Sequence, residues 1–299
     1  MRVFVTGATG WIGSAVIPEL LDAGHKVLGL ARSDTAAASL GALGAEAHRG
    51  DLADLAGLRA AAAATDGVVH LGYSHDFSRM EAAARADLAA IEAIGAELEG
   101  TGRPFVVASG VFGLAPGRVA TEQDEPAPGL HPRIAGVQAA MSFARRGVRA
   151  SSVRFAPTVH GPGDHGFLAV LTGIAREKGC SGYIDDGGHR WPAVHRLDAA
   201  RLVRLAVDAA PAGAALHAVA EEGVPTRAIA EAIGRGLGLP AVSIPAEQAG
   251  DHFGWIGRFF GLGCPASNAA TRQLLGWNPG HPGLIADLDA GHYFSSSPA

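Results

Sequence analysis

Short apolar runs alternate with longer alanine-rich stretches through the first half of the chain. Residues 3–6, 26–31 and 67–71 are apolar at most positions, which is typical of strands buried on both faces. The stretch 81–98 spaces its charges among alanines and predicts a helix. The same reasoning predicts strands at 45–49, 104–108 and 150–155, helices at 11–23, 55–64 and 131–146, and a polar turn at 32–35. This alternation predicts an α/β fold, with a doubly wound parallel sheet covered by helices.

The pattern loosens after about residue 162. Helices are predicted at 167–178, 197–209 and 226–234, the last with Thr226 as its cap, and a short strand at 216–219. Glycine is frequent in 182–188 and in the aromatic stretch 253–265. We expect residues 1–165 to form one domain, with a return segment near 190–209. Residues 166–299 are expected to form a smaller lobe over the carboxyl ends of the strands.

The composition narrows the class of protein. Of the 299 residues, 48% are hydrophobic and 18% are charged, so the chain can bury a large core. The net charge is −5 and no basic stripe occurs, which excludes nucleic acid and anionic membranes as expected partners. The longest uncharged stretch, 3–18, is shorter than the ~20 residues of a membrane span. No signal-peptide pattern precedes the first strand, so a cytoplasmic location is expected.

Two cysteines, Cys180 and Cys264, stand far apart and lack the spacing of a disulfide scaffold or a zinc site. His160, Asp164 and His165 could be drawn as a metal cluster, but the glycines and proline between them favour a loop. We therefore expect no metal site.

The strongest motif is Thr-Gly-Ala-Thr-Gly-Trp-Ile-Gly at 6–13, between a predicted strand and a predicted helix. Gly7 permits a tight turn, Gly10 lets the backbone approach a pyrophosphate, and Gly13 allows close packing of helix on sheet. The helix N-terminus supplies free N–H groups and a favourable dipole for phosphates. The motif predicts a dinucleotide site; a purely structural turn is the alternative.

This loop resembles that of the extended or atypical short-chain dehydrogenases, the NAD-dependent epimerase/dehydratase-like branch. Further segments resemble family motifs in the same order. Gly-Asp-Leu at 50–52 resembles an adenine-contacting segment, and Val-His-Leu-Gly at 69–72 a strand end along the cofactor. The segment 108–113 resembles the region of the family serine, 154–164 a stretch with nicotinamide contacts, and 194–200 a later Val-His motif. The resemblance covers residues 1 to about 205 and implies a Rossmann fold.

The end of the second strand predicts which cofactor is bound. An NAD site would place a carboxylate there, for the ribose 2′-OH, whereas this chain has Arg32 and Ser33. A guanidinium can hold a 2′-phosphate and stack on adenine, which favours NADP(H) over NAD. Asp34 lies close by and would favour NAD, and a solvated turn is a further alternative. The residues expected to contact the cofactor are Gly7, Thr9, Gly10, Trp11, Ile12, Gly13, Arg32, Ser33, Asp51, Leu52, Leu71, Gly72, Tyr73, Ser109, Pro157 and Val159.

The chain departs from the family at the Tyr-x-x-x-Lys pair, in which the tyrosine exchanges a proton with the substrate oxygen. The aligned stretch places His131 at the tyrosine position and Ala135 at the lysine position. No tyrosine occurs between Tyr73 and Tyr183, so no other alignment restores the pair. The departure removes the residue on which epimerase and dehydratase chemistry in this family relies.

Three residues are candidates for the missing role. Ser109 keeps the position whose hydroxyl binds the substrate oxygen, although it could be structural. Tyr73, in the segment Tyr-Ser-His-Asp at 73–76, could donate a proton or only shape the site. His131 could donate a proton near neutral pH or lie idle at the surface. We expect their importance to fall in the order Ser109, Tyr73, His131.

The smaller lobe offers candidates for the substrate side. Tyr183 and the segment His-Arg-Trp-Pro at 189–192 could line that side or pack within the lobe. The aromatic residues at 253–260 could cover an apolar substrate, although a core role is the simpler interpretation; they are Phe253, Trp255, Phe259 and Phe260.

The function that these features favour is that of an NADPH-dependent reductase, a ketoreductase in the broad sense. It would transfer a hydride to a C=O, C=N or conjugated C=C group of a hydrophobic small molecule. A first alternative is an NADP-binding sensor without turnover, and a second is a nucleotide-sugar epimerase or dehydratase. The expected partner is a small-molecule substrate, and a homodimer is left open.

Overall fold

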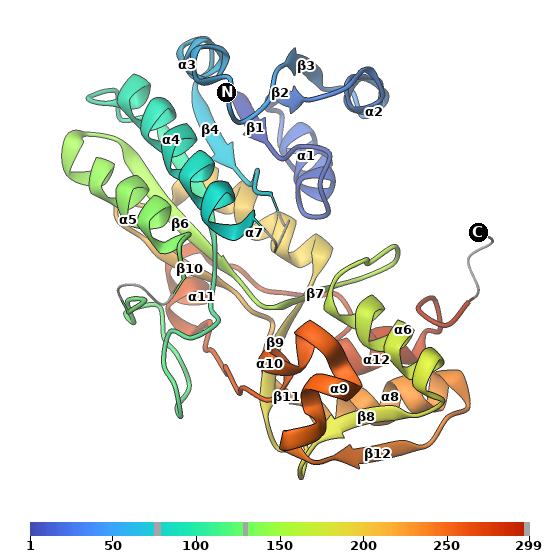
Figure 1. Ribbon diagram of the computed structural model, residues 1–299. Coiled ribbons are helices and arrows are strands. Elements are labelled where there is room, and N and C mark those ends of the chain that lie inside the picture. The colour runs from blue at the N-terminus through green and yellow to red at the C-terminus, as the bar shows by residue number, and fades with distance from the viewer. Residues whose placement is uncertain (75–78, 128–130, 296–299) are drawn as a thin grey trace.

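The computed structural model describes residues 1–74, 79–127 and 131–295. Its centre is a seven-stranded sheet in the order β10-β6-β5-β4-β1-β2-β3, and every neighbouring pair is parallel (Figure 1). The predicted doubly wound parallel sheet is therefore confirmed. The strands are β1 (Arg2–Thr6), β2 (Lys26–Ala31), β3 (Glu46–Arg49), β4 (Gly67–His70), β5 (Pro104–Gly110), β6 (Arg149–Phe155) and β10 (Ala215–Ala218).

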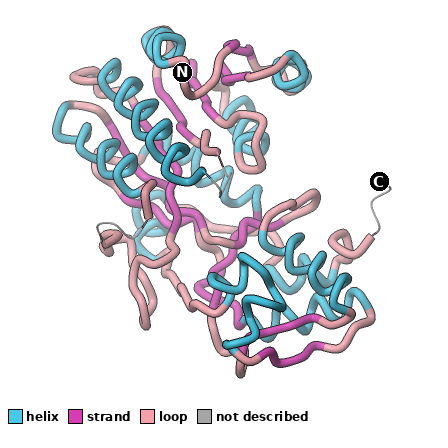
Figure 2. Tube along the Cα trace, viewed as in Figure 1, coloured by secondary structure: helices cyan, strands magenta, loops and turns pink. Residues whose placement is uncertain are grey.

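Helices cover both faces of this sheet, as the tube view in Figure 2 also shows. Successive apolar residues of a strand point to opposite faces, which is why the strands are apolar throughout. Val3 and Val5 pack into one layer and Phe4 into the other. The first layer contains α1 (Gly13–Asp22), α2 (Asp34–Ala42) and α7 (Arg196–Ala209), and the second α3 (Leu55–Ala63), α4 (Met80–Leu98) and α5 (Ile134–Ser142).

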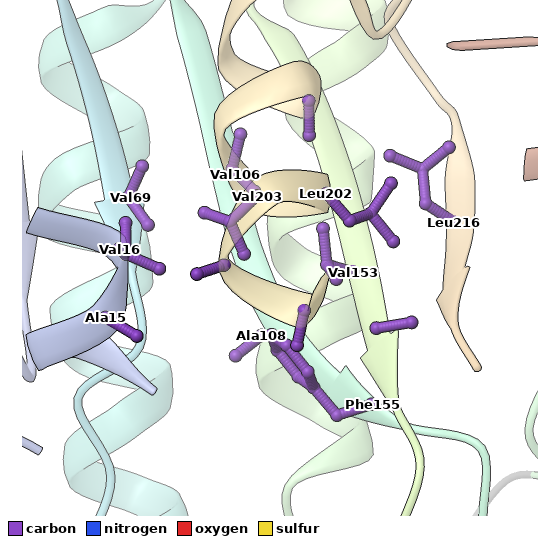
Figure 3. Close-up of a cluster of buried hydrophobic side chains, with 14 of the residues drawn as sticks. Ala15, Val16, Val69, Val106, Ala108, Val153, Phe155, Leu202, Val203 and Leu216 are labelled. Carbon is purple, nitrogen blue, oxygen red and sulfur yellow. The ribbon is translucent and has the colours of Figure 1, made fainter. Parts of the chain in front are cut away.

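The first layer depends on α7, which comes late in the sequence. Leu202 and Val203 of α7 pack beside Val106 of β5 and Val153 of β6 (Figure 3). The strand that rejoins the main sheet in this part of the chain is β10, which pairs with β6 and confirms the strand predicted near 216–219.

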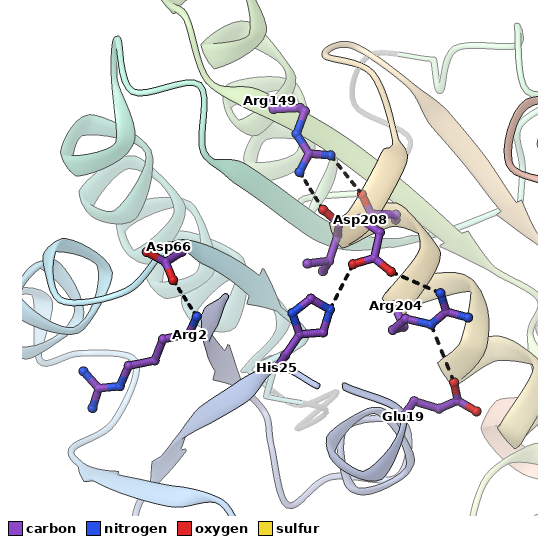
Figure 4. A network of polar contacts seen from close by, with 9 residues as sticks. Arg2, Glu19, His25, Asp66, Arg149, Arg204 and Asp208 are labelled. Atoms are coloured by element: carbon purple, nitrogen blue, oxygen red, sulfur yellow. Dashed lines mark hydrogen bonds and ion pairs between the residues drawn. The ribbon is translucent and has the colours of Figure 1, made fainter. Parts of the chain in front are cut away.

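Polar contacts fix the carboxyl end of α7 to the sheet (Figure 4). Arg149 of β6 donates hydrogen bonds to the carbonyls of Val207 and Ala210 at 2.6 and 3.1 Å, where a helix presents unpaired acceptors. Asp208 lies 2.9 Å from His25 Nε2 and accepts a hydrogen bond from Arg204. These contacts hold a late helix against the early part of the sheet.

Three local predictions need correction. The turn at 32–35 is shorter than predicted, because Ser33 caps α2 by accepting a hydrogen bond from Ala36 N and the helix begins at Asp34. The helix predicted at 131–146 starts only at Ile134 and ends in a 3-10 turn, η2 (Phe143–Arg146). Thr226 is the first residue of its helix rather than the cap, and its hydroxyl donates to the Gly187 carbonyl.

The remaining strands lie outside the main sheet. β7 (Thr158–His160), β9 (Arg190–His195) and β11 (Glu221–Pro225) form a three-stranded sheet. β8 (Ser181–Ile184) pairs in parallel with β12 (Ala241–Ile244), so part of the glycine-rich stretch 182–188 is a strand.

Short helices complete the lobe at the lower right of Figure 1. They are α6 (Phe167–Lys178), α8 (Thr226–Leu237), η3 (Ala246–Gln248), α9 (Ala249–Phe253), η4 (Gly254–Ile256), α10 (Gly257–Phe260) and α12 (Leu284–Asp289). The helix α11 (Ala269–Leu275) lies instead beside β10 of the main sheet. Within the described ranges, no helix combines the length and apolar character that crossing a membrane requires.

Candidate active site

The glycine loop between β1 and α1 is folded so tightly that side chains would not fit. Gly7 has φ +64°, and a Cβ there would lie 2.7 Å from Gly72 N at the end of β4. A Cβ on Gly13 would overlap Gly7 O, and one on Gly10 would lie 3.1 Å from the same oxygen. The loop thus presents main-chain atoms where a dinucleotide-binding loop must let a pyrophosphate approach. These residues fit the phosphates of NAD(P).

Trp11 connects the glycine loop to the later part of the chain. Its Nε1 donates a hydrogen bond to Val159 O at 2.8 Å, and the Arg196 guanidinium lies 4.2 Å above its ring. Arg196 also donates to Ser14 Oγ at 2.7 Å. The indole N–H of Trp11 is therefore hydrogen-bonded to the main chain of β7. Arg196 is not among the contacts predicted from the sequence, where its only signal is its place inside the family-like segment 194–200.

The adenosine end of the predicted cofactor site is open. Arg32 is exposed beyond β2, and the Ser33 oxygen that caps α2 keeps its own hydrogen free to donate. Asp34 forms an ion pair with Arg49, with Nη2 and Oδ1 3.0 Å apart, so its carboxylate already has a cation beside it. Asp51 turns one carboxylate oxygen to Ala53 N.

The other predicted contact residues follow the same edge of the sheet. Thr9 is exposed, and Ile12 is the N-terminal cap residue of α1. Five more are at least partly buried beside the strand ends: Leu52, Leu71, Gly72, Pro157 and Val159. This placement leaves them as predicted contacts.

Tyr73 and His131 meet at Arg133. The Arg133 guanidinium lies 4.2 Å from the centre of the Tyr73 ring, and its backbone N–H donates to His131 Nδ1 at 3.2 Å. Ser109 is half-buried at the carboxyl end of β5. The pairing of His70 with Val107 makes β4 and β5 end at one edge, so Tyr73 and Ser109 leave the sheet on neighbouring strands. His75 and Asp76 lie outside the described residues.

The two candidate proton donors differ in pKa. The pKa of the Tyr73 phenol is raised above its ordinary value of 10, chiefly by burial. The Arg133 cation opposes this shift, and the Asp87 carboxylate adds to it. Burial, and then the Arg133 cation, lower the pKa of His131 below its ordinary 6.5. Near pH 7 the phenol therefore carries a proton, whereas the imidazole is largely neutral.

A buried polar chain beneath Tyr73 was not predicted. His70 Nδ1 lies 2.9 Å from Thr6 Oγ1, and His70 Nε2 lies 3.0 Å from Asp87 Oδ1. The other oxygen of Asp87 lies 3.6 Å from Arg133 Nε. The available signal was the position of Asp87, a carboxylate on the apolar face of α4, where buried neighbours are alanine and isoleucine.

The residues considered as metal ligands have separate partners. His160 Nδ1 lies 2.9 Å from Asp287, while Asp164 accepts a hydrogen bond from the Tyr293 hydroxyl at 2.9 Å. His165 packs against the Trp11 ring. In the described part of the chain, no three His, Cys, Asp or Glu side chains are grouped to hold a metal ion.

The aromatic candidates of the lobe divide into two groups. Phe253, Phe260 and Trp191 are buried in its core, and the Trp191 Nε1 donates to the Leu262 carbonyl. Phe259 instead packs edge-on against Phe112, which follows β5, and Trp255 is 45% exposed. The remaining candidates are held by local contacts: the Arg227 guanidinium lies over the Tyr183 ring, and Arg190 Nε donates to the Gly223 carbonyl.

Comparisons with known proteins extend these observations. An uncharacterized protein of Schizosaccharomyces pombe is 46% identical over 296 residues, which cover 98% of this chain and 100% of that protein. DesIV, a dTDP-glucose 4,6-dehydratase from Streptomyces venezuelae with NAD and TYD bound, has a similar fold with a TM-score of 0.78 at 19% identity, covering 98% of this chain and 96% of that one. The UDP-glucose 4-epimerase of Thermus thermophilus in complex with NAD has a TM-score of 0.76 at 21% identity, covering 99% and 100%. The profile described as the NAD dependent epimerase/dehydratase family matches residues 3–219, and the chain belongs to that family.

Proposed function

We propose that the protein is an NADPH-dependent reductase that acts on a ketone or a related C=O, C=N or conjugated C=C group of a hydrophobic small molecule. The observation that carries this proposal is that a proton-bearing phenol, Tyr73, and Ser109 leave neighbouring strands at the edge of the sheet that holds the glycine loop. Family membership supports the coarser assignment to NAD(P)-dependent, oxidoreductase-like enzymes.

The cofactor would be held mainly by the main chain of the glycine loop. The compact turn at Gly7, Gly10 and Gly13 leaves room for the phosphates, and Arg32 with Ser33 would bind the 2′-phosphate that distinguishes NADP from NAD. The ion pair between Asp34 and Arg49 supports this preference, because it places a cation beside the carboxylate that would favour NAD. When bound, the nicotinamide supplies the hydride.

Reduction of a carbonyl also needs a proton at the oxygen, and the chain must hold or supply it. Ser109 would donate a hydrogen bond to the substrate oxygen, and Tyr73 would transfer its phenolic proton to that oxygen and recover one from water. His131 is poorly suited to this step, since its Nδ1 accepts the Arg133 N–H and its pKa is lowered.

The substrate side favours an apolar molecule. Phe112 continues from β5 into contact with Phe259, and Trp255 exposes nearly half of its surface nearby on the same lobe. Aromatic side chains of this kind provide apolar area for a ligand.

A nucleotide-sugar epimerase or dehydratase is the second candidate, favoured by the family and by similar structures such as DesIV with NAD and TYD bound. This candidate must operate without the family tyrosine, since His131 and Ala135 occupy the positions of the pair. It also predicts that NAD is retained through purification.

One set of measurements separates these functions. Calorimetry would compare NADPH with NADH, mass spectrometry would identify any retained dinucleotide, and nicotinamide absorbance would follow turnover with ketones, enones, imines, UDP-glucose and dTDP-glucose. We expect tighter binding of NADPH and oxidation of NADPH with an apolar carbonyl compound. Retained NAD with conversion of a sugar nucleotide would support the second candidate, and tight NADPH binding without any turnover would support a sensor.

A further inference from the structure

We propose that Arg133, held from below by the buried Asp87 carboxylate, positions the Tyr73 ring for proton donation and so replaces the lysine that the family would place at Ala135. This inference rests on the proposed function, because it assigns the support of its proton donor. Arg133 is a positioning residue in this scheme, since it acts through Tyr73.

The carboxylate occupies a space that the surrounding residues leave for it. Asp87 is 1% exposed on the inner face of α4, and a Cβ on Gly136 of α5 would lie 3.1 Å from Asp87 Oδ2. Glycine at this position therefore lets α5 pass over the carboxylate. A charged group this deeply buried needs compensating partners, and Arg133 supplies the positive charge.

The second oxygen of Asp87 is fixed by a hydrogen-bond chain that begins at the cofactor loop. Thr6 Oγ1 accepts the Gly72 N–H at 3.1 Å and lies 2.9 Å from His70 Nδ1. An ionised carboxylate only accepts, so His70 Nε2 donates to Asp87 Oδ1, which lies 3.0 Å away. The chain leaves Oδ2 facing Arg133 and orients the carboxylate from the strand that precedes Tyr73.

Arg133 reaches Tyr73 through the face of its ring. The guanidinium carbon lies 4.2 Å from the ring centre, within the range of a cation–π contact, and the Arg133 side chain is only 20% exposed. The planar group restricts the tilt of the ring, and its charge makes the phenol more acidic than burial alone would leave it. Among the described residues, the charged and titratable groups on this side of Tyr73 include Arg133 and Asp87. His131 is linked to Arg133, and His70 is linked to Asp87.

The first test measures kcat and KM for NADPH-dependent reduction in wild type, Tyr73→Phe, Arg133→Gln, Arg133→Lys and the double variant Tyr73→Phe/Arg133→Gln. We expect kcat to fall about 100-fold in Tyr73→Phe and about tenfold in Arg133→Gln, with KM little changed. Arg133→Lys should recover part of kcat, because it restores the charge without the planar stack. The double variant should be no slower than Tyr73→Phe.

Asp87→Asn tests the support from below, since an amide keeps the hydrogen bond from His70 and loses the charge. We expect its kcat to fall to the level of Arg133→Gln. Arg85→Gln is the matched control, because Arg85 is an exposed arginine of the same helix and its variant should behave as wild type. If the loss of kcat in Tyr73→Phe/Arg133→Gln equalled the product of the two single losses, the inference would be wrong.

A second measurement needs no turnover. The chain has three tyrosines, so the ultraviolet phenolate titration of Tyr73 is the difference between wild type and Tyr73→Phe. In Arg133→Gln the titration should move to higher pH, whereas an unchanged titration would overturn the inference. Calorimetry with NADPH keeps the two proposals distinguishable. If the folded wild-type protein did not bind NADPH, the proposed function would be wrong. The phenolate titration would still decide whether Arg133 acts on Tyr73.

Discussion

The two ends of the candidate site are built in different ways. The dinucleotide end consists of main-chain atoms in one short loop, where Gly7, Gly10 and Gly13 exclude side chains. The reaction end consists of side chains from separate elements: Tyr73 after β4, Asp87 on α4, Ser109 on β5 and Arg133 before α5. A main-chain site tolerates little added volume, whereas a side-chain site can be rearranged by substituting its members one at a time. The comparison therefore predicts unequal responses to mutation.

Gly10→Val should have the largest effect and abolish NADPH binding. A Cβ at this position already lies 3.1 Å from Gly7 O, and the branched side chain would extend into the path of the pyrophosphate. Calorimetry on the folded variant checks this result. The control is Gly41→Val in α2, where a Cβ meets nothing within 4 Å. Unchanged affinity in Gly10→Val would show that the loop is only a structural turn.

Ser109→Ala should lower kcat about 100-fold and leave NADPH affinity within about twofold, because one hydrogen bond to the reacting oxygen is lost. The matched control is Ser151→Ala on the neighbouring strand β6. The Ser151 hydroxyl is buried and has no hydrogen-bond partner among the described residues. Equal losses in both variants would mean that Ser109 acts only through the packing of the strand.

Arg32→Ala should weaken NADPH binding roughly 10- to 150-fold and change NADH binding little, since charged hydrogen bonds of ~1.5–3 kcal/mol are lost only with the phosphorylated cofactor. Calorimetry with both cofactors measures the ratio, and Arg59→Ala on α3 controls for the loss of one exposed positive charge. A similar loss for NADPH and NADH would indicate that Arg32 only stacks on adenine.

His131→Ala should have the smallest effect, less than about threefold on kcat/KM. An imidazolium donor would make reduction decline as pH rises through a pKa below 6.5, because burial lowers the pKa of His131. A Tyr73 donor keeps its proton up to a pKa above 10, so the profile should be flat from about pH 7 to about pH 9. A decline at a pH below 6.5 that disappears in His131→Ala would assign the proton to His131.

The sequence predicted the tight glycine turn between β1 and α1, because its signals are local. The glycine spacing, the preceding strand and the following helix all lie within about 20 residues of one another, as a Rossmann fingerprint requires. The strand and helix order was equally accessible, since apolar runs alternate with alanine-rich stretches. The departure from the Tyr-x-x-x-Lys pair at His131 and Ala135 stays a prediction from the sequence.

The support of the reaction end could not be predicted in the same way. Asp87 and Arg133 are separated by 46 positions, and only the packing of α4 against α5 brings them together. His70 had been included only in a motif along the cofactor, although its side chain turns away to Asp87. For Trp191 the sequence left two roles open, a contact on the substrate side or packing within the lobe, and its burial in the core of the lobe fits the second.

The position of β10 at the end of the sheet has a consequence for how the protein is made. When β6 has left the ribosome, two elements that will cover it are still to be synthesised. These are α7, which covers the apolar face of the sheet, and β10, which pairs with the free edge of β6 and begins roughly 60 residues later. The nascent chain must therefore keep an unpaired edge from joining other chains while the intervening segment emerges. A fragment ending at residue 165 inherits the same exposed edge permanently, so it should aggregate where the whole chain does not.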